Sequence, residues 1–94
     1  EIPLPDEEER LEIFRVHTRG KPFAKDVDLT VLARESQGLA GADIEAICRK
    51  AAMLAIREYL ETYPWGTDPG FQGYTARMAH LVESLKSQAK GGAR

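Results

Sequence analysis

The side chains that could do chemistry are few and widely spaced in this sequence. His17 and His80 are the only histidines, and neither has a second histidine or a cysteine at metal-site spacing. Cys48 lies on an apolar helical stripe with no histidine at local spacing, which favours a buried structural thiol over a nucleophile. The acidic run 6–9 has the spacing of a helix cap, not of an acid–base pair. The sequence therefore predicts no catalytic site and no metal site.

A short glycine-rich turn is the one feature that could bind a ligand. Gly38-Leu39-Ala40-Gly41 lacks the Lys-Ser/Thr ending of a phosphate-binding loop. The small residues of 38–43 still leave the backbone bare at the start of a predicted helix. Exposed N–H groups there would favour a flat, electron-rich ring. The alternative is a close corner between two helices, which spacing alone favours, and His17 by itself is typical of a helix end.

These residues are positioned by helices, because apolar residues recur at intervals of three and four. The pattern predicts four helices, at about 6–19, 28–37, 41–60 and 75–87. Asp6 with Glu9 has capping-box spacing, and Asp28 and Thr75 can cap the second and fourth helices. The third helix has no capping side chain because position 40 is alanine, although Asp43 in its first turn can partly compensate. The predicted fold is all-α.

The helix at 41–60 is expected to be central. Its core-facing stripe consists of Ile44, Ile47, Cys48, Ala51, Leu54 and Ala55. Met53, Ile56 and Leu60 lie on another side of the helix, and we expect the fourth helix to cover them. Docking of another protein on these three residues is the alternative.

Three segments are predicted to lie outside the helices. Residues 1–5 should form an extended lead-in, because prolines disfavour helix in the residues before them. The proline- and glycine-rich loop 62–74 carries Trp65 and Phe71 and is expected to fold back over the domain. Residues 88–94 should be a disordered tail.

Size and composition narrow the class of protein. The 94 residues suit one domain, here 6–87, and the net charge of −2 gives no electrostatic case for nucleic acid or an anionic membrane. No apolar run is long enough to cross a membrane, and a single cysteine suits a cytoplasmic compartment. Because the chain lacks an initiator methionine, we expect it to be a piece of a longer protein.

Three ordered blocks of the sequence also resemble a known family. Residues 5–19 look like the first lid helix of AAA ATPases, 26–33 are similar to the second, and 38–52 resemble the sensor-2 helix. The likeness covers roughly 2–60 and is closest to the valosin-containing-protein/Cdc48-like branch, including its archaeal members. Residues 78–86 are less closely similar to the last lid helix, and the loop 62–74 matches no part of the family.

The resemblance implies a four-helix AAA+ lid that follows a large α/β domain and closes over its ATP or ADP. It implies that Ile13 and His17 line the adenine and ribose side, and that Gly41 and Ala42 pack on the adenine. In many wider AAA+ proteins an arginine near this point reaches the γ-phosphate. Ala42 stands at that position, so this lid should not supply the charge.

The implied activity belongs to a larger assembly. The large domain would hold Mg²⁺, and the lid would couple nucleotide state to motion between subunits of a homo-hexamer that unfolds or remodels proteins. Protein substrates or adaptors are implied partners, but not nucleic acid or a membrane. The fragment lacks Walker A, Walker B and the arginine finger, so it should not hydrolyse ATP alone.

Ala40 also replaces a serine common in the family, which removes a cap worth about 1 kcal/mol. The alternative is a helical protein-interaction module without nucleotide contact; the acidic balance opposes helical DNA binding.

Overall fold

Four helices make up the fold of the computed structural model, which describes residues 3–64 and 73–92, with side chains as far as Gln88. They are α1 (Glu7–Thr18), α2 (Leu29–Glu35), α3 (Gly41–Thr62) and α4 (Met78–Gly92). The only β pairing in the described segments is an isolated bridge between Phe23 and Ala76. The predicted all-α, four-helix class is therefore confirmed, and no helix in these segments is long and apolar enough to span a membrane.

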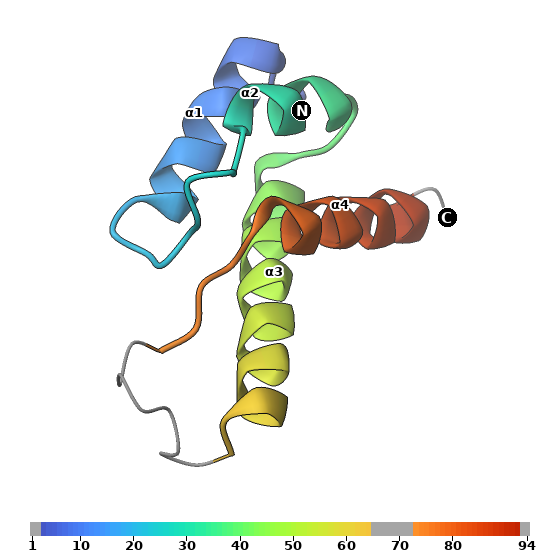
Figure 1. Ribbon diagram of the computed structural model, residues 1–94. Helices are drawn as coiled ribbons and strands as arrows, with labels where there is room; N and C mark the ends of the chain where they lie inside the picture. The colour runs from blue at the N-terminus through green and yellow to red at the C-terminus, as the bar shows by residue number, and fades with distance from the viewer. Residues whose placement is uncertain (1–2, 65–72, 93–94) are drawn as a thin grey trace.

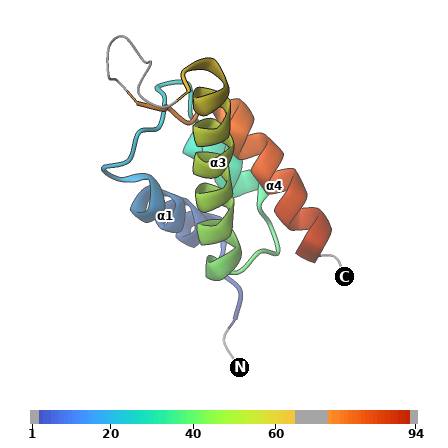
Figure 2. The same cartoon turned by 90° about the horizontal axis from the view of Figure 1, so that it is seen from below.

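The longest helix, α3, organises the others. It lies between α1 and α4 (Figure 1), and Figure 2 shows the same order after a quarter turn. α2 packs against α1 and also contacts α4. The last turns of α3 extend beyond the other helices (Figure 1). The N-terminal half of α3 is therefore the part of the helix that is enclosed by the rest of the fold.

The core forms where these helices meet. Its largest fully buried apolar side chains come from all four helices and are Phe14, Leu32, Ile44, Ile47 and Leu81. The predicted inward stripe of α3 is buried at every position except Leu54, which is half-buried. The expectation that α4 covers the other side of α3 is wrong for two residues, because Met53 and Leu60 are 53% and 38% exposed.

The first two helix starts follow the sequence prediction. Asp6 Oδ1 accepts a hydrogen bond from Glu9 N at 2.8 Å, and Asp6 N donates to Glu9 Oε1 at 2.8 Å. Asp28 Oδ1 accepts from the N–H groups of Thr30 and Val31. These side chains satisfy backbone donors that have no partner within a helix, so both caps fix where the chain turns helical.

The start of α4 corrects the prediction that Thr75 caps this helix. Ala24 N donates to Ala76 O at 2.7 Å and Ala76 N donates to Pro22 O at 2.8 Å, so the backbone before α4 pairs with the loop after α1. α4 consequently begins at Met78, whose N–H donates to Asp26 Oδ1 at 3.2 Å. His80 Nδ1 also accepts from Arg77 N at 2.9 Å, but the Asp26 side chain lies 52 residues earlier in the chain, which local spacing could not reveal.

The end of α4 corrects a second prediction. The sequence pattern predicted a disordered tail from residue 88, whereas α4 continues to Gly92. The prediction failed because Gln88 has two hydrogen-bond partners on α3, and those tertiary contacts outweigh weak local helix signals. Residues 93–94 lie outside the described residues, as do Trp65 and Phe71 of the aromatic loop. The described part of the lead-in, 3–5, is not helical, as predicted.

Candidate functional site

A shallow groove lies where α1 meets the first turn of α3. Ile13 and Gly41 form its floor, and a Cβ atom added to Gly41 would lie 3.7 Å from Ile13 Cδ1. Because Gly41 has no side chain, the backbone of α3 is open to the groove beside the Ile13 methyl groups. The groove has a volume of about 690 Å³, which is room for a flat ring system.

The first turn of α3 leaves backbone donors free, and one of them belongs to Gly41, which lines this groove. Ala40 precedes the helix and has no side-chain acceptor, and Asp43 Oδ2 instead accepts from Ala40 N at 2.9 Å. Among the described residues, no acceptor meets the N–H groups of Gly41 and Ala42. Free N–H groups at a helix N-terminus attract electron-rich ligands. The turn therefore combines an apolar surface with unsatisfied donors.

The walls of the groove come from the lead-in and from the acidic face of α1. Leu4 and Pro5 contribute apolar surface, and Leu4 is 59% exposed. Glu8, Glu9 and Glu12 place carboxylates along the other wall. Such a rim repels polyanions, so the groove suits an uncharged ring and not a chain of phosphates.

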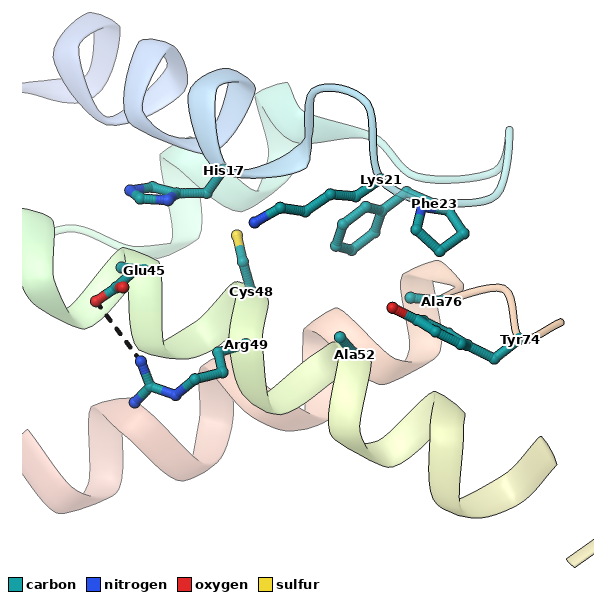
Figure 3. A pocket seen from close by; sticks show the side chains of 10 residues that line it. His17, Lys21, Phe23, Glu45, Cys48, Arg49, Ala52, Tyr74 and Ala76 are labelled. Atoms are coloured by element: carbon teal, nitrogen blue, oxygen red, sulfur yellow. Dashed lines mark ion pairs between the residues drawn. The ribbon is translucent and has the colours of Figure 1, made fainter. Parts of the chain in front are cut away.

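A second pocket of about 270 Å³ lies one turn further along α1 (Figure 3). His17 and Lys21 face it from α1 and the following loop, and Cys48 faces it from α3. Its apolar lining consists of Pro22, Phe23, Ala52, Tyr74 and Ala76. Glu45 and Arg49 pair with each other at 3.6 Å on its rim. This pocket is separate from the groove at Gly41, although both open on α1.

Cys48 is a structural thiol in this second pocket, as the sequence predicted. Its side chain is 4% exposed, and burial raises the pKa of the thiol to about 11 although the nearby Lys21 ammonium opposes the shift. A protonated, buried thiol is a poor nucleophile. Among the described residues there is also no group of three or more His, Cys, Asp or Glu that could hold a metal ion.

Comparisons with known proteins show which family the sequence resembles. Residues 26–66 match the family model of the AAA+ lid domain. The chain is 57% identical to the Cell division cycle protein 48 homolog of Archaeoglobus fulgidus over 94 aligned residues, which cover 90% of this chain and 12% of that protein. It is 61% identical to the proteasome-activating nucleotidase of Methanopyrus kandleri over 57 residues, which cover 61% of this chain and 13% of that protein.

The chain carries an AAA+ lid domain. It spans only about an eighth of the length of these curated relatives. The block matched by the family model begins in the loop before α2 and includes all of α3. The groove at Gly41 therefore lies partly within the block that defines the lid.

The lid brings together only part of the predicted nucleotide set. Ile13 and Gly41 line one groove, whereas His17 faces the second pocket. Ile13 and His17 do share the face of α1 that four-residue spacing predicted. Ala42 is exposed and lines neither cavity. The assignment of all four residues to a nucleotide stays a prediction.

Two residues that shape the groove were missed in the sequence. Leu4 was placed in a featureless lead-in, although an apolar residue between two prolines has a fixed extended backbone that can present it. Arg10 is 5% exposed and donates to Pro5 O at 3.0 Å, which ties the lead-in to α1. Its four-residue spacing from the buried Phe14 was the signal that it faces inward.

Proposed function

We propose that this lid closes over ATP or ADP bound to a preceding large domain, with the base in the groove between Ile13 and Gly41. The observation that carries the proposal is the first turn of α3, where Gly41, with a free N–H, lines the groove beside the apolar Ile13. Adenine offers ring nitrogens to such donors and an apolar face to Ile13. The residues present therefore fit the base of a nucleotide.

In this proposal the nucleotide is divided between two domains. Glu8, Glu9 and Glu12 on the wall of the groove would repel phosphates, and Ala42 carries no charge. Phosphates and Mg²⁺ would consequently be held by the large domain, which supplies the chemistry of hydrolysis. His17, one turn beyond Ile13, would approach the ribose side. The lid would hold the base and exclude water from it.

The proposal extends to the wider role that the resemblance to AAA ATPases implies. The lid would transmit nucleotide state to neighbouring subunits of a homo-hexamer that unfolds or remodels proteins in the cytoplasm, with protein substrates or adaptors as further partners. The exposed Met53 and Leu60 support a subunit contact, because exposed apolar side chains on one helix often mark an interface. If the base did not bind the lid, these residues would favour the alternative of a protein-interaction module.

Gly41→Trp tests the base site in a chain that contains both the large domain and this lid. The backbone of Gly41 is not among those with positive φ, so an indole can be placed there without backbone strain. The indole would fill the space beside Ile13, and we expect the affinity for a fluorescent ADP analogue to fall at least about tenfold, or about 1.4 kcal/mol. Gly41→Ala should have a much smaller effect, because its Cβ makes only ordinary contact with Ile13.

Val16→Trp is the matched control. Val16 lies on the same helix as Ile13 but is 57% exposed and lines neither cavity. A tryptophan there should leave both nucleotide affinity and the thermal unfolding midpoint unchanged. Unchanged affinity in the Gly41→Trp protein would contradict the base site and leave the interaction module as the better account.

A further inference from the structure

The C-terminal half of α4 reaches back to the first turn of α3 through one side chain. Gln88 Nε2 donates to Asp43 Oδ1 at 2.8 Å, and Gln88 Oε1 accepts from Lys50 Nζ at 2.9 Å. The amide group of Gln88 is thus held between a carboxylate and an ammonium group of the same helix. These partners require its oxygen and nitrogen to point in opposite, fixed directions.

Asp43 is in turn the residue that holds the backbone before α3. Its second oxygen, Oδ2, accepts from Ala40 N at 2.9 Å. Because Ala40 offers no cap of its own, this bond is the side-chain tie between the turn and the helix. A chain of hydrogen bonds therefore runs from Lys50 through Gln88 and Asp43 to the Leu39–Ala40 peptide, one residue before Gly41.

We infer that Gln88 is a positioning residue for the nucleotide groove and couples the C-terminal half of α4 to the base. The inference rests on the proposed base site, and it goes beyond it by adding a residue that touches no nucleotide. Gln88 fixes the rotamer of Asp43, and Asp43 holds the Leu39–Ala40 peptide, which carries the Ala40 N–H. The position of Ala40 in turn sets the direction of the free N–H of the next residue, Gly41. A shift of α4 would change the groove through this path.

Gln88→Glu tests the coupling with little change in size. The new carboxylate would face Asp43 Oδ1, where Gln88 Nε2 now donates, so a hydrogen bond is replaced by like-charge repulsion. In the intact ATPase we expect affinity for the fluorescent ADP analogue to fall about three- to tenfold, the effect of losing one such bond. Hydrogen exchange at the Ala40 amide should accelerate about tenfold.

A double variant that combines Asp43→Asn with Gln88→Glu distinguishes positioning from general damage, because it exchanges the two groups. The amide introduced at position 43 can accept from Ala40 N through its oxygen, and its NH₂ group can donate to the carboxylate introduced at position 88. That carboxylate can still accept from Lys50 Nζ. We expect nucleotide affinity and Ala40 exchange to return to within about twofold of wild type. A variant that merely weakened α4 would not be rescued in this way.

Gln37→Glu is the matched control for added negative charge, since Gln37 is exposed and no hydrogen bond to its side chain is found among the described residues. Unchanged Ala40 exchange in Gln88→Glu, or no recovery in the double variant, would overturn the inference. So would unchanged affinity in Gln88→Glu where Gly41→Trp does weaken binding. If Gly41→Trp also left affinity unchanged, the base site itself would be wrong, and with it the coupling to nucleotide.

Discussion

At the scale of single residues, burial decides which side chains are chemically available. Cys48 and His17 face the same pocket, yet the thiol is almost fully buried and His17 only half-buried. Burial raises the pKa of Cys48 from its ordinary 9.0 to about 11, since the charged thiolate loses hydration inside the protein. A cysteine beside a histidine in a pocket is therefore no catalytic pair here.

Cys48 should consequently react very slowly in the folded lid. At pH 8, a pKa of about 11 leaves about one thiol in a thousand ionised, against about one in ten at a pKa of 9.0. We expect alkylation by iodoacetamide at pH 8 to be at least about a hundredfold slower in the folded than in the unfolded chain. The contribution of the protonated thiol to stability is intact below pH 9 and is lost as the pH rises toward 11.

Met53→Cys in a Cys48→Ala background is the matched control for this measurement. It places a thiol on the same helix at a side chain that is 53% exposed. That thiol should be alkylated at nearly the unfolded rate. Equal rates for Cys48 and the introduced cysteine would show that Cys48 is accessible and that burial does not control it.

The sequence predicted only part of the candidate site. The shared face of Ile13 and His17 follows from four-residue spacing, and the bare first turn of α3 follows from the small residues there. That the two side chains open into different cavities could not be predicted. The second pocket is closed by Lys21 and Tyr74, which come from segments far apart in the chain and meet only after folding.

At the scale of elements, helix ends capped by nearby residues were predictable and those capped from a distance were not. Asp6 and Asp28 cap the helices that follow them, and both were predicted. α4 begins instead where Asp26 meets Met78 N, and it continues past residue 88 because Gln88 reaches α3. Periodicity therefore gave the number and type of the helices, while tertiary contacts set the bounds of α4.

Arg10 is the side chain that joins α1 to α2 and to the lead-in. It donates to Ala33 O at 2.9 Å, to Ser36 Oγ at 3.2 Å and to Pro5 O at 3.0 Å. The first two acceptors lie at the C-terminal end of α2, where the helix dipole also favours a cation. No carboxylate forms an ion pair with Arg10 among the described residues. Neutral oxygens, two of them from the backbone, thus hold this buried charge.

Arg10→Met should lower the free energy of unfolding by about 2–4 kcal/mol, because it removes these charge-assisted hydrogen bonds and leaves buried carbonyls unsatisfied. Urea unfolding followed by circular dichroism measures the change. Arg15→Met is the matched control: its partner is an exposed Glu12, so the same substitution should cost less than about 1 kcal/mol. If both variants lost the same free energy of unfolding, the buried hydrogen bonds of Arg10 would contribute no more stability than an exposed ion pair.

At the scale of the whole molecule, α3 runs between two surfaces, the groove proposed for the base and the exposed side proposed for a subunit contact. Its N-terminal turn faces the groove, and its C-terminal turns extend beyond the other helices (Figure 1). Met53, beside α4, and Leu60, near the end of α3, are both exposed. A rigid helix between the two transmits a change of direction at one end to the other. In the proposed function, α3 would link the base site to the subunit contact.

The exposed side of α3 should therefore affect assembly and not base binding. Met53 borders a shallow pocket of about 200 Å³ between α3 and α4, with Lys50 and Arg57 nearby. Met53→Asp would bury a carboxylate in any apolar subunit contact there, at a cost of a few kcal/mol. It should leave the fold intact, because Arg57 lies four residues on and can pair with the new charge.

Sedimentation velocity of a chain that contains both the large domain and this lid measures this prediction. We expect Met53→Asp to weaken assembly of the proposed hexamer by at least about tenfold in protein concentration, since a penalty of about 1.4 kcal/mol already produces that change. Nucleotide binding by the single subunit should not change. The dissociated Met53→Asp subunit should bind the ADP analogue as tightly as the dissociated wild-type subunit, because the groove lies at the other end of α3. Val16→Asp, on an equally exposed side chain of α1, supplies the control. A ring as stable as wild type in the Met53→Asp protein would remove this side of α3 from the subunit interface and leave it free for an adaptor or substrate protein.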